Sequence, residues 1–499
     1  MYTTFNIPTY LILAMDSSSL SSMELPSLKP YNLKNPTTTL IQSWVSSPKP
    51  NTLTLVSSNS PLTKKFQSFL LHCSTKPDTN TNNDTHSKKN NEPNSLSNKS
   101  NKESQPQEKI ESFSSSSSSS QSSNSTTSLS SRGLVFDLGF SNSWDSEDIG
   151  SPVVKRFQSD EEERWYMWYH GRPKGKPSND LIGLAISSNG VHWERGGGPA
   201  KSGSDVGFVM NCGKDWWGFD TRGIRPSGLL IMSSYRVRGS NAVYWLYYTG
   251  YSSESVEVCD HSSEFSFDSP IGLNDENFGK GKILKSLPGL AISQDGRNWA
   301  RIEGEHHSGA LIDVGKEKDW DSLFISSPQV VYHGNGDLRM YYHSFDKEKG
   351  EFCIGIARSR DGIKWLKLGK IMGGGKVGSF DEFGVMNACV TRNKSGGNYV
   401  MVYEGVGSNG RRCIGIAISP DGLMEWVRVQ DEAILMPSNE GCWDDKDVGS
   451  PCLVYMDNEE NEWRLYYRGV GNGGSVGIGM AVSNGKDFRS FRRWTGFHV

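Results

Sequence analysis

From residue 133 onward, short segments of alternating apolar and polar residues recur along the chain. The segment richest in aromatic residues appears five times, as WYMWYHG (165–171), YWLYYTG (244–250), LRMYYHS (338–344), YVMVYEG (399–405) and WRLYYRG (463–469). Alternation with a period of two, together with many Tyr and Trp residues, is typical of β-strands. The pattern therefore predicts five copies of one β-rich unit, and helical periods are absent.

Two further motifs flank each copy of this strand. The preceding motif reads WDSEDIGSP from Trp144, FDTRGIRPS from Phe219, WDSLFISSP from Trp320, FDEFGVMNA from Phe380 and WDDKDVGSP from Trp443. The following motif reads IGLAISSNGVHW (182–193), PGLAISQDGRNW (288–299), IGIARSRDGIKW (354–365), IGIAISPDGLMEW (414–426) and IGMAVSNGKDF (478–488). An Asn-Gly or Asp-Gly pair between two apolar segments indicates a tight turn between strands.

Each unit thus contains about four antiparallel strands. Five such units predict an all-β fold over residues 132–499, a five-bladed β-propeller of four-stranded antiparallel blades. A solenoid would not need four strands per unit, and a βα fold would need helical periods. We expect the segment Gly133 to Phe140 to supply an outer strand that closes the ring onto the last blade.

The N-terminal region has a different composition. Residues 1–131 are rich in Ser, Thr, Asn and Pro, with an unbroken serine run at 114–120, and cannot bury enough apolar surface to fold. We therefore expect this region to be disordered. Residues 1–72 contain two acidic residues, five lysines and no arginine, which favours a plastid transit peptide and a location in the chloroplast stroma. Residues 73–131 would be a Ser/Asn-rich linker. The alternative is a disordered tail of a cytosolic or nuclear protein.

Charge and cysteine content exclude several classes of function. The 53 basic and 56 acidic residues give a net charge of −3, which provides no basic surface for nucleic acid. No run of 18 apolar residues is present, so we expect no membrane-spanning helix. The eight cysteines show no zinc-binding spacing, and buried free thiols in a reducing compartment are the simplest interpretation. We expect no metal and no cofactor.

Candidate chemistry lies where the repeats differ from one another. The aspartate in the second position of the preceding motif occurs in all five units, which indicates a structural role. Glycoside cleavage needs two carboxylates across a sugar ring. We expect Asp148 as base or nucleophile, Glu404 as acid and Asp447 as a reserve carboxylate. The expected substrate-binding residues are His170, Arg225, His343, Asn387 and Arg468. The alternative is a polar mouth whose charges form salt bridges between blades.

The block SPQVVYHGNGDLRMYYHS (327–344), followed by IGIARSRDGIKW, resembles the five-bladed propellers of the arabinanase, levansucrase and invertase superfamily. Glycoside hydrolase family 43 and its relatives share this pattern. The resemblance covers residues 133–499 and implies a carbohydrate-active protein, identified here with a plastid-targeted plant member.

The resemblance also implies where catalytic residues should lie. Members of the superfamily carry an Asp on the inner strand of blade one, a second Asp in blade two and a Glu in blade three. Asp148 matches the first position, and blade two offers only Asp220. Residues 323–331 of blade three contain no Glu, so the catalytic set is incomplete. Two functions remain open. One is a glycosidase that acts on a glycan or sugar conjugate, and the other is a non-catalytic propeller that binds sugar or a protein partner.

Overall fold

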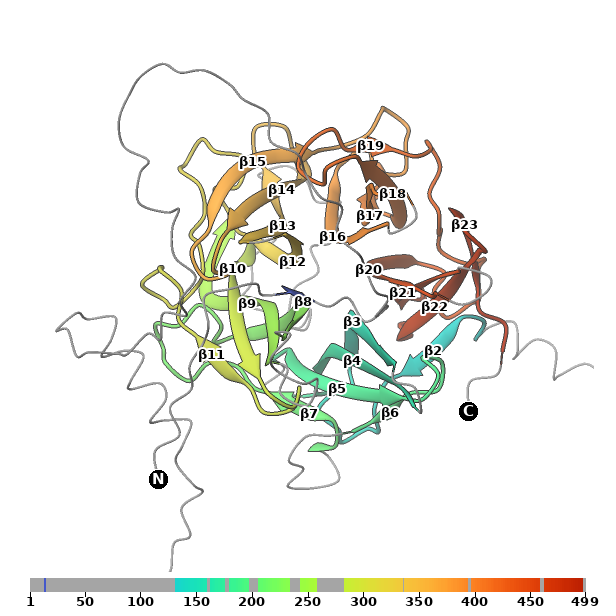
Figure 1. Cartoon of the computed structure of the whole chain (residues 1–499). Coiled ribbons are helices and arrows are strands. Elements are labelled where there is room, and N and C mark those ends of the chain that lie inside the picture. Colours follow the sequence, from blue (N-terminus) through green and yellow to red (C-terminus); the bar gives the residue numbers. More distant parts are fainter. Residues whose placement is uncertain are drawn as a thin grey trace, which may run out of the picture. The chain divides into compact units, whose positions relative to one another are not determined.

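The protein folds as an all-β propeller of five blades around a central axis, as the sequence predicts (Figure 1). The computed structural model describes residues 13–14, 131–158, 162–175, 179–196, 205–233, 243–257, 282–334, 336–393, 396–457 and 462–496. The expected transit peptide (1–72) and linker (73–131) lie outside these residues, apart from positions 13, 14 and 131. Those two expectations, and the plastid location, stay predictions.

Each blade is an antiparallel sheet whose strands follow one another from the axis outwards. Blade 1 comprises β3 (Asp148–Gln158), β4 (Glu163–Arg172), β5 (Leu181–Ser187) and β6 (Glu194–Arg195), with β7 (Phe208–Met210) also paired to β5. Blade 2 comprises β8 (Gly223–Ser233), β9 (Val243–Glu257), β10 (Lys282–Ser293) and β11 (Ala300–Ile302). A two-residue strand, β1 (Leu13–Ala14), pairs with β8.

The remaining blades repeat the order. Blade 3 comprises β12 (Ser326–Gly334), β13 (Asp337–Asp346), β14 (Glu351–Ser359) and β15 (Leu366–Met372). Blade 4 comprises β16 (Val385–Arg392), β17 (Tyr399–Val406), β18 (Arg412–Ser419) and β19 (Val427–Arg428). Blade 5 comprises β20 (Asp447–Tyr455), β21 (Trp463–Val470) and β22 (Val476–Asn484), with β2 (Leu134–Asp137) and β23 (Asp487–Arg493) both paired to β22.

The first strand of the ring closes it onto the last blade. β2 pairs antiparallel with β22, which confirms the strand expected from Gly133 to Phe140. The Phe136 side chain of β2 then packs edge-on against Tyr169 of blade 1, with ring centroids 4.9 Å apart. Because β2 joins the sheet of blade 5 and the core of blade 1, residues near the start of the fold connect its two ends.

The aspartate shared by all repeats has the structural role that its repetition indicates. In every blade it is buried and accepts a hydrogen bond of 2.8–3.0 Å from a tyrosine of the second strand. In every blade it also contacts a basic side chain of the outermost strand, at a distance of 2.7–2.8 Å. The five aspartates are Asp145, Asp220, Asp321, Asp381 and Asp444. A buried carboxylate is stable only with such partners, so these groups tie the layers of each blade together.

Every inner strand contains a β-bulge near its start. Four of the bulges place one residue at positive φ: Ser151, Ser327, Asn387 and Ser450, with φ between 46° and 53°. Residues with short polar side chains tolerate this conformation better than bulky ones do. Pro226 stands at the equivalent position of blade 2, where its ring fixes φ at a negative value. The residues near the end of the motif that precedes each aromatic-rich strand therefore form these bulges.

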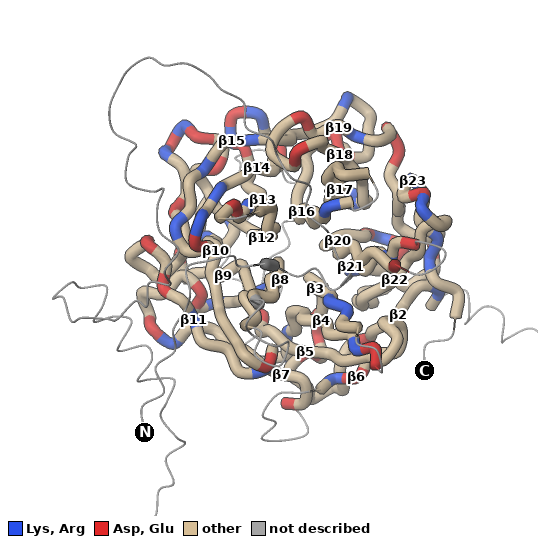
Figure 2. The backbone as a smooth tube through the Cα atoms, in the orientation of Figure 1, with Lys and Arg blue, Asp and Glu red and all other residues tan. Residues whose placement is uncertain are grey.

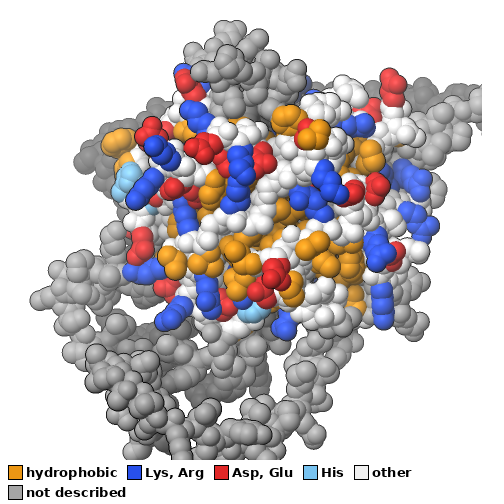
Figure 3. All heavy atoms as spheres, turned by 90° about the horizontal axis from the view of Figure 1, so that it is seen from above, with side chains coloured by type: hydrophobic (Ala, Val, Ile, Leu, Met, Phe, Trp, Pro, Cys, Tyr) orange, Lys and Arg blue, Asp and Glu red, His pale blue; other side chains and the backbone are white. Residues whose placement is uncertain are grey.

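Charged residues of both signs are distributed around the ring (Figure 2). On the side of the molecule seen in Figure 3, basic and acidic groups surround scattered hydrophobic side chains. In the part of the chain that the structure describes, no helix is long and apolar enough to cross a membrane.

Candidate functional site

The predicted site residues gather where the inner strands begin. Asp148 and Asp447 are the first residues of β3 and β20, whereas His170, His343, Glu404 and Arg468 lie near the ends of the second strands. Antiparallel pairing brings these two sets to the same end of the propeller. Gly150 and Gly449 leave the room that this requires. A Cβ atom at Gly150 would lie 2.3 Å from Cδ of Arg468, and one at Gly449 would lie 2.3 Å from Oε2 of Glu404.

Asp148 of blade 1 is bound by arginines from two blades. Arg468 of blade 5 donates to its Oδ1 at 2.8 Å and also to the carbonyl oxygen of Ile149 at 3.2 Å. Arg172, directly opposite Asp148 in the β3–β4 pairing, lies 3.5 Å from Oδ2. Burial opposes the charge, but Arg468, His170 and Arg172 outweigh it and keep the pKa of Asp148 well below its usual range. Asp148 is therefore an ionised carboxylate enclosed by cations.

A second buried carboxylate continues this network into blade 2. Asp180, which is fully buried, accepts from Arg172 at 2.7 Å and from Arg225 at 2.5 Å. Burial and the nearby Arg225 lower the pKa of His170, whose Nε2 lies 3.6 Å from Asp148. The structure thus brings together four predicted residues, namely Asp148, His170, Arg225 and Arg468. It adds Arg172 and Asp180, which the sequence reasoning missed.

Glu404 of blade 4 is held in the same manner by its neighbours. Its Oε2 accepts from the Asn387 amide and from the Ser450 backbone N–H, both at 2.8 Å. Its Oε1 lies 3.3 Å from the guanidinium of Arg412, another residue that the sequence reasoning missed. Only 1% of Glu404 is exposed. Its Oε2 therefore already accepts two hydrogen bonds. Its Oε1 accepts none in the described part of the structure and contacts Arg412 as an ion pair.

The two other predicted residues of this region also have structural partners. Asp447 accepts a hydrogen bond of 3.0 Å from the backbone N–H of Arg412. His343 of blade 3 accepts one of 3.3 Å from the backbone N–H of Asn387 in blade 4. Burial, with a smaller contribution from the charge of Arg412, lowers the pKa of His343 to about 3. His343 is therefore a neutral imidazole that supports the neighbouring bulge.

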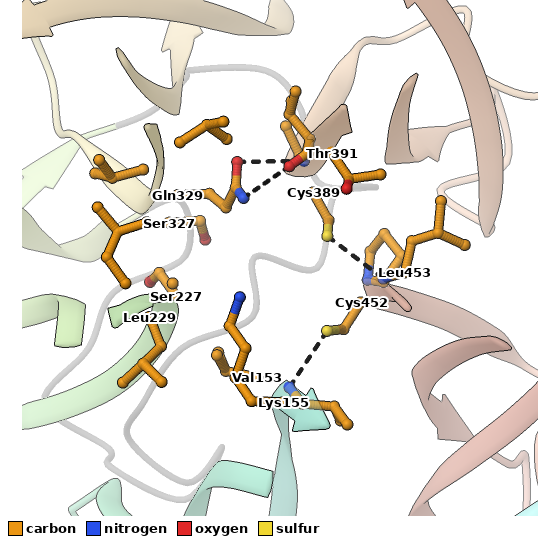
Figure 4. A pocket seen from close by; sticks show the side chains of 18 of the residues that line it. Val153, Lys155, Ser227, Leu229, Ser327, Gln329, Cys389, Thr391, Cys452 and Leu453 are labelled. Carbon is orange, nitrogen blue, oxygen red and sulfur yellow. Dashed lines mark hydrogen bonds between the residues drawn. The ribbon is translucent and has the colours of Figure 1, made fainter. Parts of the chain in front are cut away.

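A cavity of about 800 Å³ follows the axis beyond the bulges (Figure 4). All five inner strands contribute to its wall, which includes the bulge residues Ser151, Ser327, Asn387 and Ser450. Of the eight predicted site residues, Asn387 lines this cavity, and the other seven lie outside its wall. The charged network and the cavity therefore occupy successive levels along the axis.

This arrangement is better suited to joining blades than to cleaving a glycosidic bond. A glycosidase acid must hold a proton and deliver it to the leaving oxygen, and its partner must reach the sugar. Asp148 and Glu404 are both buried and both contact an arginine. Their bonds join blade 5 to blade 1 and blade 4 to blade 5.

One group of described side chains has the spacing of metal ligands. Asp346, Glu351 and Cys353 offer ligand atoms within 4.8 Å of one another. The ammonium of Lys370 lies 2.9 Å from Asp346 and 3.6 Å from Glu351. An ammonium group of the protein itself thus already contacts both carboxylates.

Comparison with solved structures returns matches of low sequence identity. They include a complex of BT0996 with RGII, in which the matched protein is 17% identical over 74% of this sequence and 96% of its own, with a TM-score of 0.48. A structure from the GH130 family of mannoside phosphorylases, which contains glycoside hydrolases that target β-1,2 mannosidic linkages in Candida mannan, is 16% identical over 71% and 89%, with a TM-score of 0.45. An N-acetylgalactosamine deacetylase from F. plautii in complex with blood group B trisaccharide is 13% identical over 72% and 96%, with a TM-score of 0.46. No protein-family model and no curated protein matches the sequence.

Proposed function

We propose that the protein is a carbohydrate-binding propeller that does not hydrolyse its ligand. The observation that carries the proposal is that both candidate catalytic carboxylates, Asp148 and Glu404, are buried and occupied by arginines of the protein. In such a site the two side chains hold neighbouring blades in position. The resemblance of the sequence to the arabinanase, levansucrase and invertase superfamily then concerns the scaffold and the class of ligand.

The axial cavity is the proposed binding site. Polar residues in its wall are Ser151, Ser227, Ser327, Asn387 and Ser450. The hydroxyl groups of the first three also form hydrogen bonds within the protein, with His170, Thr249 and Asn387 respectively. Neutral hydroxyl and amide groups that converge on a cavity suit the hydroxyl groups of a sugar, which both donate and accept hydrogen bonds. A volume of about 800 Å³ is in the range of small-molecule sites. The cavity would admit a mono- or disaccharide or the sugar end of a conjugate.

Binding can be tested with the full chain by saturation-transfer NMR against a panel of plant oligosaccharides and aryl glycosides. Ser227→Tyr introduces a ring into the cavity and should weaken binding by tenfold or more. Ser252→Tyr is the matched control, because Ser252 lies on β9 and its hydroxyl contacts the carbonyl of Lys285 at 3.4 Å, away from the cavity. Both variants should melt as the parent does. If every panel member fails to bind the folded parent, or if Ser227→Tyr leaves binding unchanged, the proposal is wrong.

A further inference from the structure

Two cysteines lie side by side in the wall of the axial cavity. Cys389 of β16 and Cys452 of β20 occupy the same position in blades 4 and 5, directly after the bulge. Both line the cavity, and Figure 4 shows their side chains on adjacent strands. The sulfur of Cys389 lies 3.4 Å from the backbone nitrogen of Leu453, the residue that follows Cys452. Since β16 belongs to blade 4 and β20 to blade 5, the pair lies where two blades meet.

Each sulfur also accepts a hydrogen bond from a backbone N–H group of the following blade. Leu453 donates to Cys389 and Val154 donates to Cys452, both at 3.4 Å. In blade 3 the equivalent residue is Gln329, whose side-chain amide bonds both the N–H and the carbonyl of Val390, at 3.2 and 3.1 Å. A side-chain amide is therefore sufficient to bond the backbone of the next inner strand. Two adjacent thiols also have a chemical reactivity that this structural role does not require.

The surroundings of the pair favour a thiolate at Cys452. The Cys389 S–H, the Val154 N–H and the charge of Lys155 together lower the pKa of Cys452, although burial acts in the opposite direction. Lys155 extends into the same cavity (Figure 4). Elsewhere, burial raises the pKa of Cys353 to about 12 and that of Cys413 to about 11. Among the described thiols with a shifted pKa, Cys452 is the one shifted towards reactivity.

We propose that Cys452 and Cys389 form a redox-active thiol pair that a hydroperoxide converts into a disulfide between blades 4 and 5. The Cys452 thiolate attacks one oxygen of hydrogen peroxide, the O–O bond breaks, and the departing hydroxide takes up a proton to become water. The resulting sulfenic acid is attacked by the sulfur of Cys389, which forms the S–S bond and releases the second water with the Cys389 proton. Two thiols are oxidised by two electrons, and one peroxide is reduced to two waters. This inference does not depend on sugar binding.

The test uses the full chain at pH 7 with one equivalent of hydrogen peroxide. Remaining thiols are blocked with N-ethylmaleimide, and digested peptides are analysed by mass spectrometry. We expect a linked peptide pair that contains positions 389 and 452, reversible by dithiothreitol, before any change at Cys353 or Cys413. In C389S the reaction should stop at a Cys452 sulfenic acid that dimedone traps. C413S is the matched control and should leave the rate of disulfide formation unchanged.

A second measurement needs no cysteine variant. In the folded parent, maleimide should modify Cys452 at least tenfold faster than Cys353 or Cys413, and K155M should slow this reaction by about tenfold for each unit that the pKa of Cys452 rises. Equal modification rates at the three cysteines would overturn the proposal. So would the absence of a 389–452 disulfide at peroxide concentrations that already oxidise methionine.

Discussion

Removal of the bond between Asp148 and Arg468 tests whether these residues are structural. We expect D148N to lower the free energy of unfolding, because it leaves a buried guanidinium without its carboxylate. Breaking a buried ion pair by removing one partner costs about 3–5 kcal/mol. In D148N, however, Arg468 keeps its hydrogen bond of 3.2 Å to the carbonyl oxygen of Ile149. Arg172 likewise keeps its hydrogen bond of 2.7 Å to Asp180. The loss should therefore lie at or just below the lower end of this range, at about 2–3 kcal/mol.

R468M should cost about 3 kcal/mol, because Asp148 then retains Arg172 at the longer distance of 3.5 Å. The double variant removes both charges of the pair. Its loss should be smaller than the sum of the two single losses by at least about 1 kcal/mol.

Urea unfolding followed by circular dichroism and by tryptophan fluorescence gives the four free energies at pH 7. The two probes must coincide for each variant, so that the unfolding free energies can be compared. Losses below about 0.5 kcal/mol for both single variants would refute the structural role, since surface substitutions have effects of this size. Additive losses would show that the two residues do not interact.

Two further predictions concern the buried histidine and the closure of the ring. Because the pKa of His343 is about 3 in the folded protein and about 6.5 in the unfolded chain, the unfolded state binds the extra proton as the pH falls. His343 should thus contribute full stability above pH 6.5 and lose about 2 kcal/mol between pH 7 and pH 5. H343Q should reduce the acid-induced loss by that amount in urea titrations at the two pH values, and an unchanged loss would contradict the assignment. F136A should lower stability by about 3–5 kcal/mol, because Phe136 is 1% exposed and packs against Tyr169. F140A is its matched control, since Phe140 is 92% exposed, and equal losses in thermal melts would argue against closure by β2.

The fold is predictable from the sequence because its symmetry is visible there. Five copies of the same three motifs identify five blades, and an aspartate found in all of them is expected to bind within its own blade. The hydrogen bond of Tyr467 to Asp444 repeats that of Tyr169 to Asp145. The closing strand β2 was also predicted, from the segment Gly133 to Phe140 that precedes the first repeat, and it pairs with β22 beside β23, the outer strand of the last repeat itself.

The contacts of the candidate site were not predictable, because they cross between blades. Asp148 and Arg468 are 320 positions apart, and the repeats carry no information on which side chains of adjacent blades meet. Arg172 could have been found, since extending the β3–β4 register places it directly opposite Asp148. Asp180 and Arg412 lie just outside the repeated motifs and gave no such signal. Cys389 and Cys452 could have been paired by aligning the residues that follow each bulge.

The most direct test of the account is release of reducing sugar by the purified full chain on plant glycans and aryl glycosides. The parent, D148N and E404Q are compared at equal concentration of folded protein. We expect none of the three to release sugar above the rate without protein, because both carboxylates are occupied by arginines. Release by the parent that disappears in both variants would contradict the account and establish Asp148 and Glu404 as catalytic residues.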